Sequence, residues 1–518
     1  MPVRSATAAS VGLLLAGAAA AWILTPAPSA PPRAATVGDC SSLAGRRLGP
    51  ARITSAETIG PQGAWSAAPN ERPITVAVPF CRVQGVMEKE MAFELWLPQA
   101  AVWNGKFLGA GVGGDAGAFN LRDLPRGVAR GYASATTDTG HKSSDSTWMM
   151  GDPDRLANYT HRANHLLAQA GKAITAAYYA KAPRLSYFIG CSGGGRQGLK
   201  EMQAYPADYD GIIAGAPGPK TPEMTVRRMW EILRRDARPG LMAPADWALI
   251  AEEGAKTCDR EDGVADGVAE DPQTCRFDPA VLQCGKERTG RCLSAEQVEF
   301  AGGFYSPMKD EAGRAIDGGL LPGVLVDSGR SRLAPATFGQ AVRRDTNWNG
   351  AGFSVAGDLK AIKRVMPDLA ADKTDLSAFE RRGGKAILYH GWMDPAVAAR
   401  MMLAYSDDVA KTMGGKATAD RFMRLYMVPG MGHCAGGPGA DQFGGAGSDA
   451  PTVDASHDML TALEDWVEKG RAPQTIVASK ITGGRVVRTH PLCPYPARAR
   501  YSGKGSPDDA ASYTCARG

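Results

Sequence analysis

The chain has 518 residues, too many for one small hydrophobic core, so its length indicates several domains or one large domain with an insertion. The composition is that of an ordinary globular protein, with 44% hydrophobic and 22% charged residues. The net charge of +5 is small and the charges are scattered, which argues against nucleic acid or an anionic membrane surface as a partner.

Residues 1–35 have the features of an export signal. Arg4 supplies a basic start, residues 11–24 form an Ala/Leu-rich apolar stretch, and residues 26–32 form a Pro/Ala/Ser break. The apolar stretch is short for a membrane span, and retention as an uncleaved N-terminal anchor is the alternative. In either case we expect a secreted or periplasmic protein.

The ten cysteines of an exported chain predict disulfides. No Cys-x-x-Cys pair occurs in the sequence, which argues against a tetrahedral zinc site. Connectivity does not follow from sequence alone, but spacing makes four pairs plausible. These pairs are Cys40 with Cys81, Cys258 with Cys275, Cys284 with Cys292, and Cys493 with Cys515. Cys191 and Cys434 then remain.

The folded body begins with segments that predict strands. Residues 75–84 and 91–97 do so by alternation and β-branched content. A further buried strand runs into a glycine-rich loop at residues 109–117. In a hydrolase, such a loop after an early strand supplies a backbone N–H of the oxyanion hole, here from Gly113 or Gly114. A flexible surface loop is the alternative.

The stretch around Ser192 carries the main chemical signal. A predicted amphipathic helix over 157–180 and an apolar strand over 185–189 precede Gly190-Cys191-Ser192-Gly193-Gly194, and a helix over 196–205 follows. A serine on such a turn is pushed out of the sheet, and the glycines let strand and helix approach each other. The pattern predicts the nucleophile elbow of an α/β-hydrolase. A glycine-rich surface loop is the alternative, since the chain contains 63 glycines.

The character of the chain changes over residues 219–379. Strand–helix alternation stops, Pro/Gly breaks accumulate, and four of the cysteines lie here. We interpret this segment as a lid domain inserted into an α/β-hydrolase core, whose two parts are residues 36–218 and 380–518.

Alternation resumes with a buried strand over 385–391, which is followed by Asp394, and a strand over 423–428 leads into His433. Ser192, Asp394 and His433 thus follow the chain order of an α/β-hydrolase triad, beyond C-terminal strand ends. We expect Ser192 to be the nucleophile, His433 the base that takes its proton, and Asp394 the group that orients and stabilises the imidazolium.

The neighbours of this triad carry a second signal. Cys191 precedes Ser192 and Cys434 follows His433, so a serine and histidine within hydrogen-bond reach would bring the two cysteines close enough to bridge. The alternative is that each cysteine pairs elsewhere. His390 ends a predicted strand, where it could support the site.

The inserted segment contains an acidic cluster, Asp259, Asp262 and Asp266, with intervening glycines that let the chain wrap. Hard oxygen ligands in a flexible loop suit Ca²⁺, although the spacing is not that of an EF-hand. A solvated acidic turn is the alternative.

These residues together resemble the tannase and feruloyl esterase family. The resemblance is carried by Gly190-Cys191-Ser192-x-Gly194-Gly195, Asp394 and His433-Cys434, and it extends over nearly the whole mature chain. It implies an α/β-hydrolase core with a lid over the active site, and a disulfide that joins the neighbours of serine and histidine. The four other disulfide pairs also match. It further implies that the N–H of Gly193 donates to the oxyanion.

The resemblance also implies one structural Ca²⁺ in the lid. The implied ligands are the side chains of Asp259, Asp262 and Asp266 and the backbone carbonyls of Val264 and Val268.

The activity implied is hydrolysis of esters of aromatic acids, such as gallate, ferulate, hydroxybenzoate or terephthalate half-esters, through an acyl-enzyme. The partner is then a small aromatic ester, with no nucleic acid and no membrane beyond the possible anchor. No motif locates the residues that bind the acyl ring. Trp348, Arg343 and Arg344 are our candidates, since an arginine would suit a carboxylate-bearing acyl group.

Three alternatives belong to other functional classes. A serine peptidase on the same fold would cleave an aromatic amide as well as its ester, and an acyltransferase would prefer an alcohol to water. A catalytically silent, Ca²⁺-stabilised binding module would not hydrolyse a chromogenic ester.

Overall fold

The computed structural model describes residues 38–67, 73–261, 263–285, 290–326 and 333–517. The predicted export signal at residues 1–35 lies outside these ranges, and so does Asp262 of the predicted calcium site. Within these ranges, no helix combines the length and the apolar character that crossing a bilayer requires.

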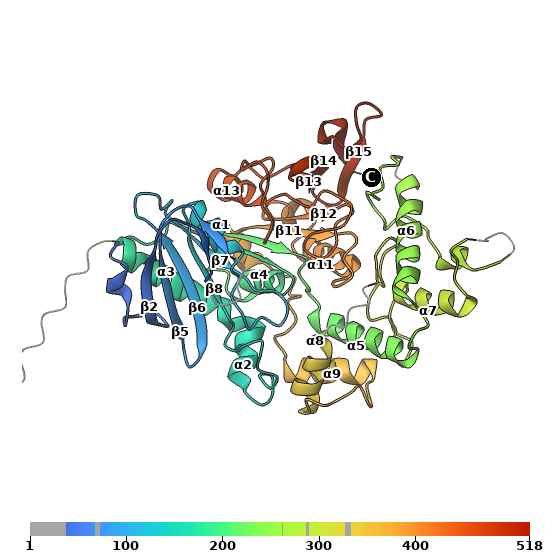
Figure 1. The fold of residues 1–518 in the computed structure, drawn as a ribbon, viewed down its shortest axis with the longest axis horizontal. Helices are drawn as coiled ribbons and strands as arrows, with labels where there is room; N and C mark the ends of the chain where they lie inside the picture. The colour runs from blue at the N-terminus through green and yellow to red at the C-terminus, as the bar shows by residue number, and fades with distance from the viewer. Residues whose placement is uncertain (1–37, 68–72, 262, 286–289, 327–332, 518) are drawn as a thin grey trace, which may run out of the picture. The chain divides into compact units, whose positions relative to one another are not determined.

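A ten-stranded sheet forms the centre of the fold, in the order β1-β2-β5-β6-β8-β7-β9-β10-β11-β12 (Figure 1). Its strands are β1 (Arg47–Leu48), β2 (Ala51–Ile59), β5 (Phe80–Met87), β6 (Met91–Pro98), β7 (Lys106–Ala110), β8 (Ala133–Thr137), β9 (Leu185–Cys191), β10 (Gly211–Gly215), β11 (Lys385–Gly391) and β12 (Met423–Val428). From β8 to β12 neighbouring strands are parallel, whereas β1 to β6 pair antiparallel. The carboxyl ends of the parallel strands therefore meet at one edge of the sheet.

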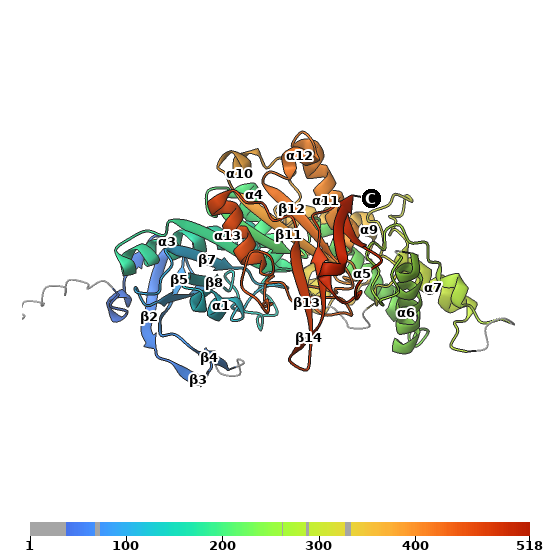
Figure 2. The same ribbon diagram turned by 90° about the horizontal axis from the view of Figure 1, so that it is seen from above.

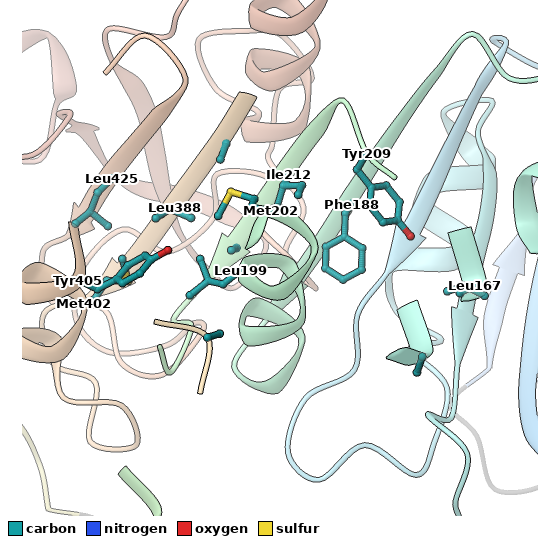
Figure 3. Close-up of a cluster of buried hydrophobic side chains, with 14 of the residues drawn as sticks. Leu167, Phe188, Leu199, Met202, Tyr209, Ile212, Leu388, Met402, Tyr405 and Leu425 are labelled. Atoms are coloured by element: carbon teal, nitrogen blue, oxygen red, sulfur yellow. The ribbon is translucent and has the colours of Figure 1, made fainter. Parts of the chain in front are cut away.

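Helices cover both faces of the parallel half, because its strands are apolar on both sides. One face packs against α3 (Ala163–Tyr179), α4 (Gly193–Ala204) and α11 (Ala399–Thr412), and the other against α1 (Asp123–Ala129) and α13 (Met459–Lys469). Figure 3 shows the first of these layers, in which Leu199 and Met202 of α4 point toward Ile212 and Leu388 of the sheet. This is the predicted α/β-hydrolase arrangement.

The chain leaves the sheet after β10 and returns at β11 through a helical insertion, which lies beside the sheet in Figures 1 and 2. The insertion comprises α5 (Thr221–Ala237), α6 (Pro244–Glu261), a 3₁₀ turn (Pro279–Leu282), α7 (Ala295–Tyr305), α8 (Leu333–Ala336), a π-helical segment (Thr337–Arg343), α9 (Val355–Val365) and α10 (Ser377–Arg381). The insertion corresponds to residues 219–379, where the sequence shows no strand–helix alternation.

Two predicted elements differ from the structure. The single strand predicted over 75–84 is two strands, β4 (Ile74–Val76) and β5, because Pro79 has no N–H to donate and interrupts the ladder. The helix predicted over 157–180 is divided into α2 (Pro153–Ala157), a π-helical turn (Asn158–Arg162) and α3. The small-residue strand β8 was not predicted.

Short ribbons complete the fold outside the sheet. β3 (Gln62–Trp65) pairs with β4, β13 (Ile476–Thr482) with β14 (Arg485–Leu492), and β15 (Ala497–Tyr501) with β16 (Tyr513–Arg517). Figure 2 shows the β3–β4 ribbon extending beyond the sheet on the side of α1. A short helix, α12 (Lys416–Ala419), precedes β12.

Five disulfides join the ten cysteines. They are Cys40–Cys81, Cys191–Cys434, Cys258–Cys275, Cys284–Cys292 and Cys493–Cys515, which are the pairs that the sequence predicted. Such a disulfide content fits an extracellular or other oxidising compartment.

Candidate active site

Ser192 occupies the sharp turn between β9 and α4. Its backbone dihedrals are φ 60° and ψ −123°, a region that side-chain-bearing residues rarely adopt. Its N–H donates to the carbonyl of Gly215 at 2.9 Å. A Cβ on Gly195 would lie 2.2 Å from the same carbonyl oxygen, so glycine is needed for α4 to approach β10. The helix begins directly after the serine, at Gly193, earlier than the start at residue 196 that the sequence predicted.

Asp394 and His433 meet beyond the ends of β11 and β12. His433 Nδ1 lies 2.8 Å from Asp394 Oδ2, and Asp394 is fully buried. The backbone N–H groups of Ala396 and Val397 donate to Asp394 Oδ1 at 2.7 and 2.9 Å. Burial opposes ionisation of Asp394, but the contact with His433 and these hydrogen bonds outweigh it and lower the pKa of the carboxyl. Asp394 is therefore held as a carboxylate facing the imidazole.

His390 supports this pair from inside the sheet. Its Nε2 donates to the carbonyl of Val397 at 2.9 Å and lies 3.4 Å from Asp394 Oδ2. Burial lowers the pKa of His390, so the ring stays neutral at ordinary pH. The structure thus places His390 where it helps to fix the orientation of Asp394.

The Cys191–Cys434 disulfide connects the serine turn to the histidine loop. The Cα atoms of the two cysteines are 6.0 Å apart across a sequence separation of 243 residues. Because each cysteine is adjacent to a member of the Ser192/His433 pair, the bridge restrains the distance between these two side chains.

The glycine-rich loop after β7 passes directly beside Ser192. A Cβ on Gly193 would lie 2.7 Å from the carbonyl oxygen of Gly114, and one on Gly113 would lie 4.0 Å from the Cβ of Ser192. The structure therefore brings all three candidate oxyanion glycines to the nucleophile. A side chain at position 193 would have to displace the loop.

Two amide side chains hold this loop, and sequence reasoning missed both. Gln197 on α4 accepts from the N–H of Val112 at 3.0 Å and donates to its carbonyl at 3.1 Å. Asn120 donates to the carbonyl of Gly111 at 2.7 Å. The only available signal was the position of Gln197 in the first turns of the elbow helix, which does not reveal its partner.

Ser192 and His433 line one cavity of about 1280 Å³. Other lining residues come from the glycine-rich loop, from α1 and the residues that flank it, from the β3–β4 ribbon and from the loop before α13; among them are Gly113, Gly114, Ile74, Phe119, Arg122, Arg126, Arg130, Ala446, Gly447 and Val453. None of the lining residues within the described ranges belongs to the segment 219–379.

The candidate acyl-binding residues lie in the insertion. The Arg343 guanidinium pairs with Asp358 at 2.6 Å and lies over the ring of Trp348, 5.2 Å from its centre. Arg344 is exposed, and Trp348 is half-buried. The structure therefore brings Arg343 and Trp348 together, but neither lines the cavity beside Ser192.

The calcium candidates Asp259 and Asp266 lie close to each other at the end of α6. Asp259 Oδ1 accepts from the N–H groups of Asp266, Gly267 and Val268 at 3.1, 3.0 and 3.2 Å. Asp266 Oδ1 accepts from Val268 at 3.0 Å. The turn therefore wraps its backbone N–H groups around two carboxylates, and the Arg488 guanidinium lies 3.6 Å from Asp266 Oδ2.

The described part of the turn does not by itself form a complete metal site. No group of three or more acidic, histidine or cysteine side chains in the described ranges is arranged to hold a metal ion. Asp262, the third implied carboxylate, is not among the described residues.

Comparisons with known proteins show which family the chain resembles over its whole folded body. A family model described as tannase and feruloyl esterase matches residues 75–325 and 336–516. An uncharacterized esterase of Xanthomonas campestris is 35% identical over 92% of this chain and 91% of its own. The mono(2-hydroxyethyl) terephthalate hydrolase of Piscinibacter sakaiensis is 33% identical over 89% of each chain. The solved structure of feruloyl esterase B from Aspergillus oryzae has a TM-score of 0.85 at 28% identity, covering 91% of this chain and 98% of that one.

The matches extend over both parts of the sheet and over the insertion, so they concern the whole folded body rather than one motif. The chain is therefore an esterase of the tannase and feruloyl esterase family.

Proposed function

We propose that this protein hydrolyses esters of aromatic acids through an acyl-enzyme formed on Ser192. The observation that carries the proposal is the 2.8 Å contact between His433 and Asp394, with His433 and Ser192 lining the same cavity. Ser192 Oγ attacks the ester carbonyl while His433 takes its proton. His433 then returns that proton to the leaving alcohol, and water hydrolyses the acyl-enzyme by the same route.

Backbone N–H groups stabilise the oxyanion in this proposal. Gly193 follows the nucleophile, and Gly113 or Gly114 supplies the second donor from the loop that Gln197 holds. Because these donors belong to fixed backbone, they need little reorganisation as charge develops on the carbonyl oxygen.

The preference for an aromatic acyl group is argued from different observations than the serine mechanism. Its support is the chemistry named for two similar proteins, a feruloyl esterase and a terephthalate half-ester hydrolase. A further support is Val112, an apolar residue of the glycine-rich loop that lines the cavity beside Ser192 and packs with Trp148, Tyr159 and, from the insertion, Phe338. Trp348 with Arg343 or Arg344 remains our proposal for contacts to a carboxylate-bearing ring, although Arg343 would have to share its guanidinium with Asp358.

We also propose that the turn at Asp259 and Asp266 holds a structural Ca²⁺, together with Asp262 and the carbonyls of Val264 and Val268. When bound, the ion would neutralise the clustered carboxylates and stabilise the insertion, and it would take no part in the ester chemistry. Secretion or periplasmic export completes the proposal, supported by the five disulfides.

A matched ester panel tests this function. We expect kcat/KM for methyl ferulate, methyl gallate, methyl 4-hydroxybenzoate or a terephthalate half-ester to exceed that for butyrate and hexanoate esters by at least about tenfold, or about 1.4 kcal/mol. Ser192→Ala protein, purified in parallel, controls for contaminating esterases. Equal cleavage of the aliphatic esters would overturn the aromatic assignment, and cleavage of the matching aromatic amide would favour a peptidase.

A further inference from the structure

The cavity beside Ser192 is lined by His433 and by the loop glycines Gly113 and Gly114, whereas no residue of segment 219–379 in the described ranges lines it. Because the histidine delivers its proton to the leaving alcohol, this cavity is placed to receive the alcohol portion of the ester. Its volume of about 1280 Å³ exceeds the roughly 300–1,000 Å³ of ordinary small-molecule sites. An alcohol much larger than methanol therefore fits.

Two arginines in the cavity wall are already neutralised. Arg126 contacts Asp458 at 3.1 Å and donates to the carbonyls of Gly444 and Gly445 at 2.8 and 2.7 Å. Arg130 contacts the same Asp458 at 2.7 Å. These contacts fix the loop before α13 against α1, so neither guanidinium is free for a ligand.

Arg122 is different, although it lies on the same wall. No hydrogen bond or ion pair of its guanidinium is found within the described part of the chain, and the side chain is exposed to the cavity. The guanidinium lies beside Gly447, where an added Cβ would be 3.7 Å from its Cζ, Nε and Nη1 atoms. The adjacent Asp123 is buried and already accepts from the N–H of Gly447 at 2.9 Å and from Asn120 at 2.8 Å.

The backbone of Arg122 is also fixed relative to the oxyanion loop. Its N–H donates to Asn120 Oδ1 at 3.2 Å, while Asn120 Nδ2 donates to the carbonyl of Gly111 at 2.7 Å. One side chain therefore connects the arginine to the loop that contains Gly113. A group held by Arg122 would be positioned with respect to the ester carbonyl.

Building on the proposed function, we propose that Arg122 binds an anionic group, a carboxylate, on the alcohol portion of the substrate. The preferred substrates would then be aromatic esters of hydroxy acids rather than of neutral alcohols. A planar guanidinium can pair with a carboxylate through two parallel hydrogen bonds, and it stays charged at all working pH values. The apolar walls at Ile74, Phe119 and Val453 would contact the carbon chain between the ester and the carboxylate.

Paired substrates that differ only in the alcohol test the inference. The acyl group is held constant, first as ferulate and then as butyrate, and the alcohol is either an ω-hydroxy acid of two, four or six carbons or the diol of equal length. For at least one chain length we expect the wild type to favour the hydroxy-acid ester by about tenfold in kcat/KM. Arg122→Gln should reduce the ratio of hydroxy-acid to diol ester to near one, and Arg122→Lys should retain part of it.

Arg47→Gln is the matched control. It removes the same charge from an exposed arginine of β1 that does not line the cavity, so the ratio should stay at the wild-type value. The preference should also weaken as salt is raised, since the contact is partly exposed.

The outcomes separate the two proposals. Equal ratios in wild type and Arg122→Gln at every chain length, with ferulate esters still preferred to butyrate esters, would overturn the role of Arg122 and leave the proposed function intact. A butyrate preference with a ratio that depends on Arg122 would overturn the aromatic assignment alone. A ratio that falls equally in Arg47→Gln would show a general charge effect and also overturn the inference.

Discussion

The sheet side and the insertion side of this esterase are held together by different means. On the sheet side, the serine turn, the histidine loop and the oxyanion loop are joined by the Cys191–Cys434 bridge and by buried hydrogen bonds of Asp394 and Gln197. The insertion meets the rest of the fold through an apolar cluster and through separate polar contacts, such as His490 with Glu270 at 2.8 Å, with no disulfide between the two among the five bridges.

This difference shows which side chains and loops must be positioned precisely. The ester reaction requires that the reacting groups be placed to within well under about an ångström. Hydrogen bonds and a disulfide therefore hold the serine turn, the histidine loop and the glycine-rich loop. Apolar packing is non-directional, so the part of the insertion that packs through the apolar cluster needs less precise placement. Variants that remove a directional contact near Ser192 should therefore lose more activity than matched variants in the insertion.

The largest expected effect comes from the reacting groups. Ser192→Ala and His433→Ala should each lower kcat by at least about 10⁴-fold, because the nucleophile and its base act as a unit. Asp394→Asn should also be severe, since the imidazole would lose its orienting carboxylate. Steady-state kinetics on the preferred ester measures this, with circular dichroism as the control for folding. If His433→Ala retained a tenth of the activity, the base would have been misassigned.

Removing the bridge beside the triad should have the next largest effect. The Cys191→Ala/Cys434→Ala variant should lose about 10²-fold or more in kcat by displacing His433. It should also lose about 5 kcal/mol of stability, because the bridge closes a loop of 243 residues.

The matched control is Cys284→Ala/Cys292→Ala in the insertion. That bridge closes only 8 residues, so about 2.5 kcal/mol of stability and little kcat should be lost. Activity and denaturant melts are measured on both variants. Similar kcat losses in the two would refute a positioning role for the Cys191–Cys434 bridge.

Two glutamines of α4 contact different parts of the chain: Gln197 contacts the glycine-rich loop, and Gln203 contacts the insertion. Their variants can therefore be compared. Gln197→Met should lower kcat by about tenfold, because the backbone of Val112 loses both of its hydrogen bonds to this side chain. Gln203→Met instead removes a 2.7 Å bond to the carbonyl of Ala371, near the end of the insertion. Both variants should lose about 1–3 kcal/mol of stability, yet only the first should lose kcat at saturating substrate. Equal kcat losses would mean that the kinetic effect reports general destabilisation.

Calcium removal should have the smallest effect on chemistry. If the turn at Asp259 and Asp266 holds Ca²⁺, a chelator should lower the melting temperature, and re-addition of Ca²⁺ should restore it. Activity at low temperature should change little, because the triad receives no help from the ion. Elemental analysis of untreated, active protein provides the direct check, and absence of calcium there would contradict the site.

Much of the reacting centre could be predicted from the sequence, because its determinants are local. The strand–Gly-x-Ser-x-Gly–helix pattern, and the strands over 385–391 and 423–428 before Asp394 and His433, follow from short-range periodicity and turn chemistry. The adjacency of Cys191 and Cys434 to Ser192 and His433 is equally visible in the linear chain, and it predicted their bridge.

The fold class and the order of Ser192, Asp394 and His433 along the chain could thus be predicted from the sequence, and spacing made plausible the disulfide pairs that the structure contains. The tertiary structure was needed to show that Gln197 holds the glycine-rich loop at Val112, and that Arg126 and Arg130 share Asp458 while the Arg122 guanidinium has no partner among the described residues. These contacts join residues far apart in the chain, such as Arg126 and Asp458, separated by 332 positions. No periodicity or turn preference encodes such a pairing, because it exists only once the sheet has brought α1 and the loop before α13 together.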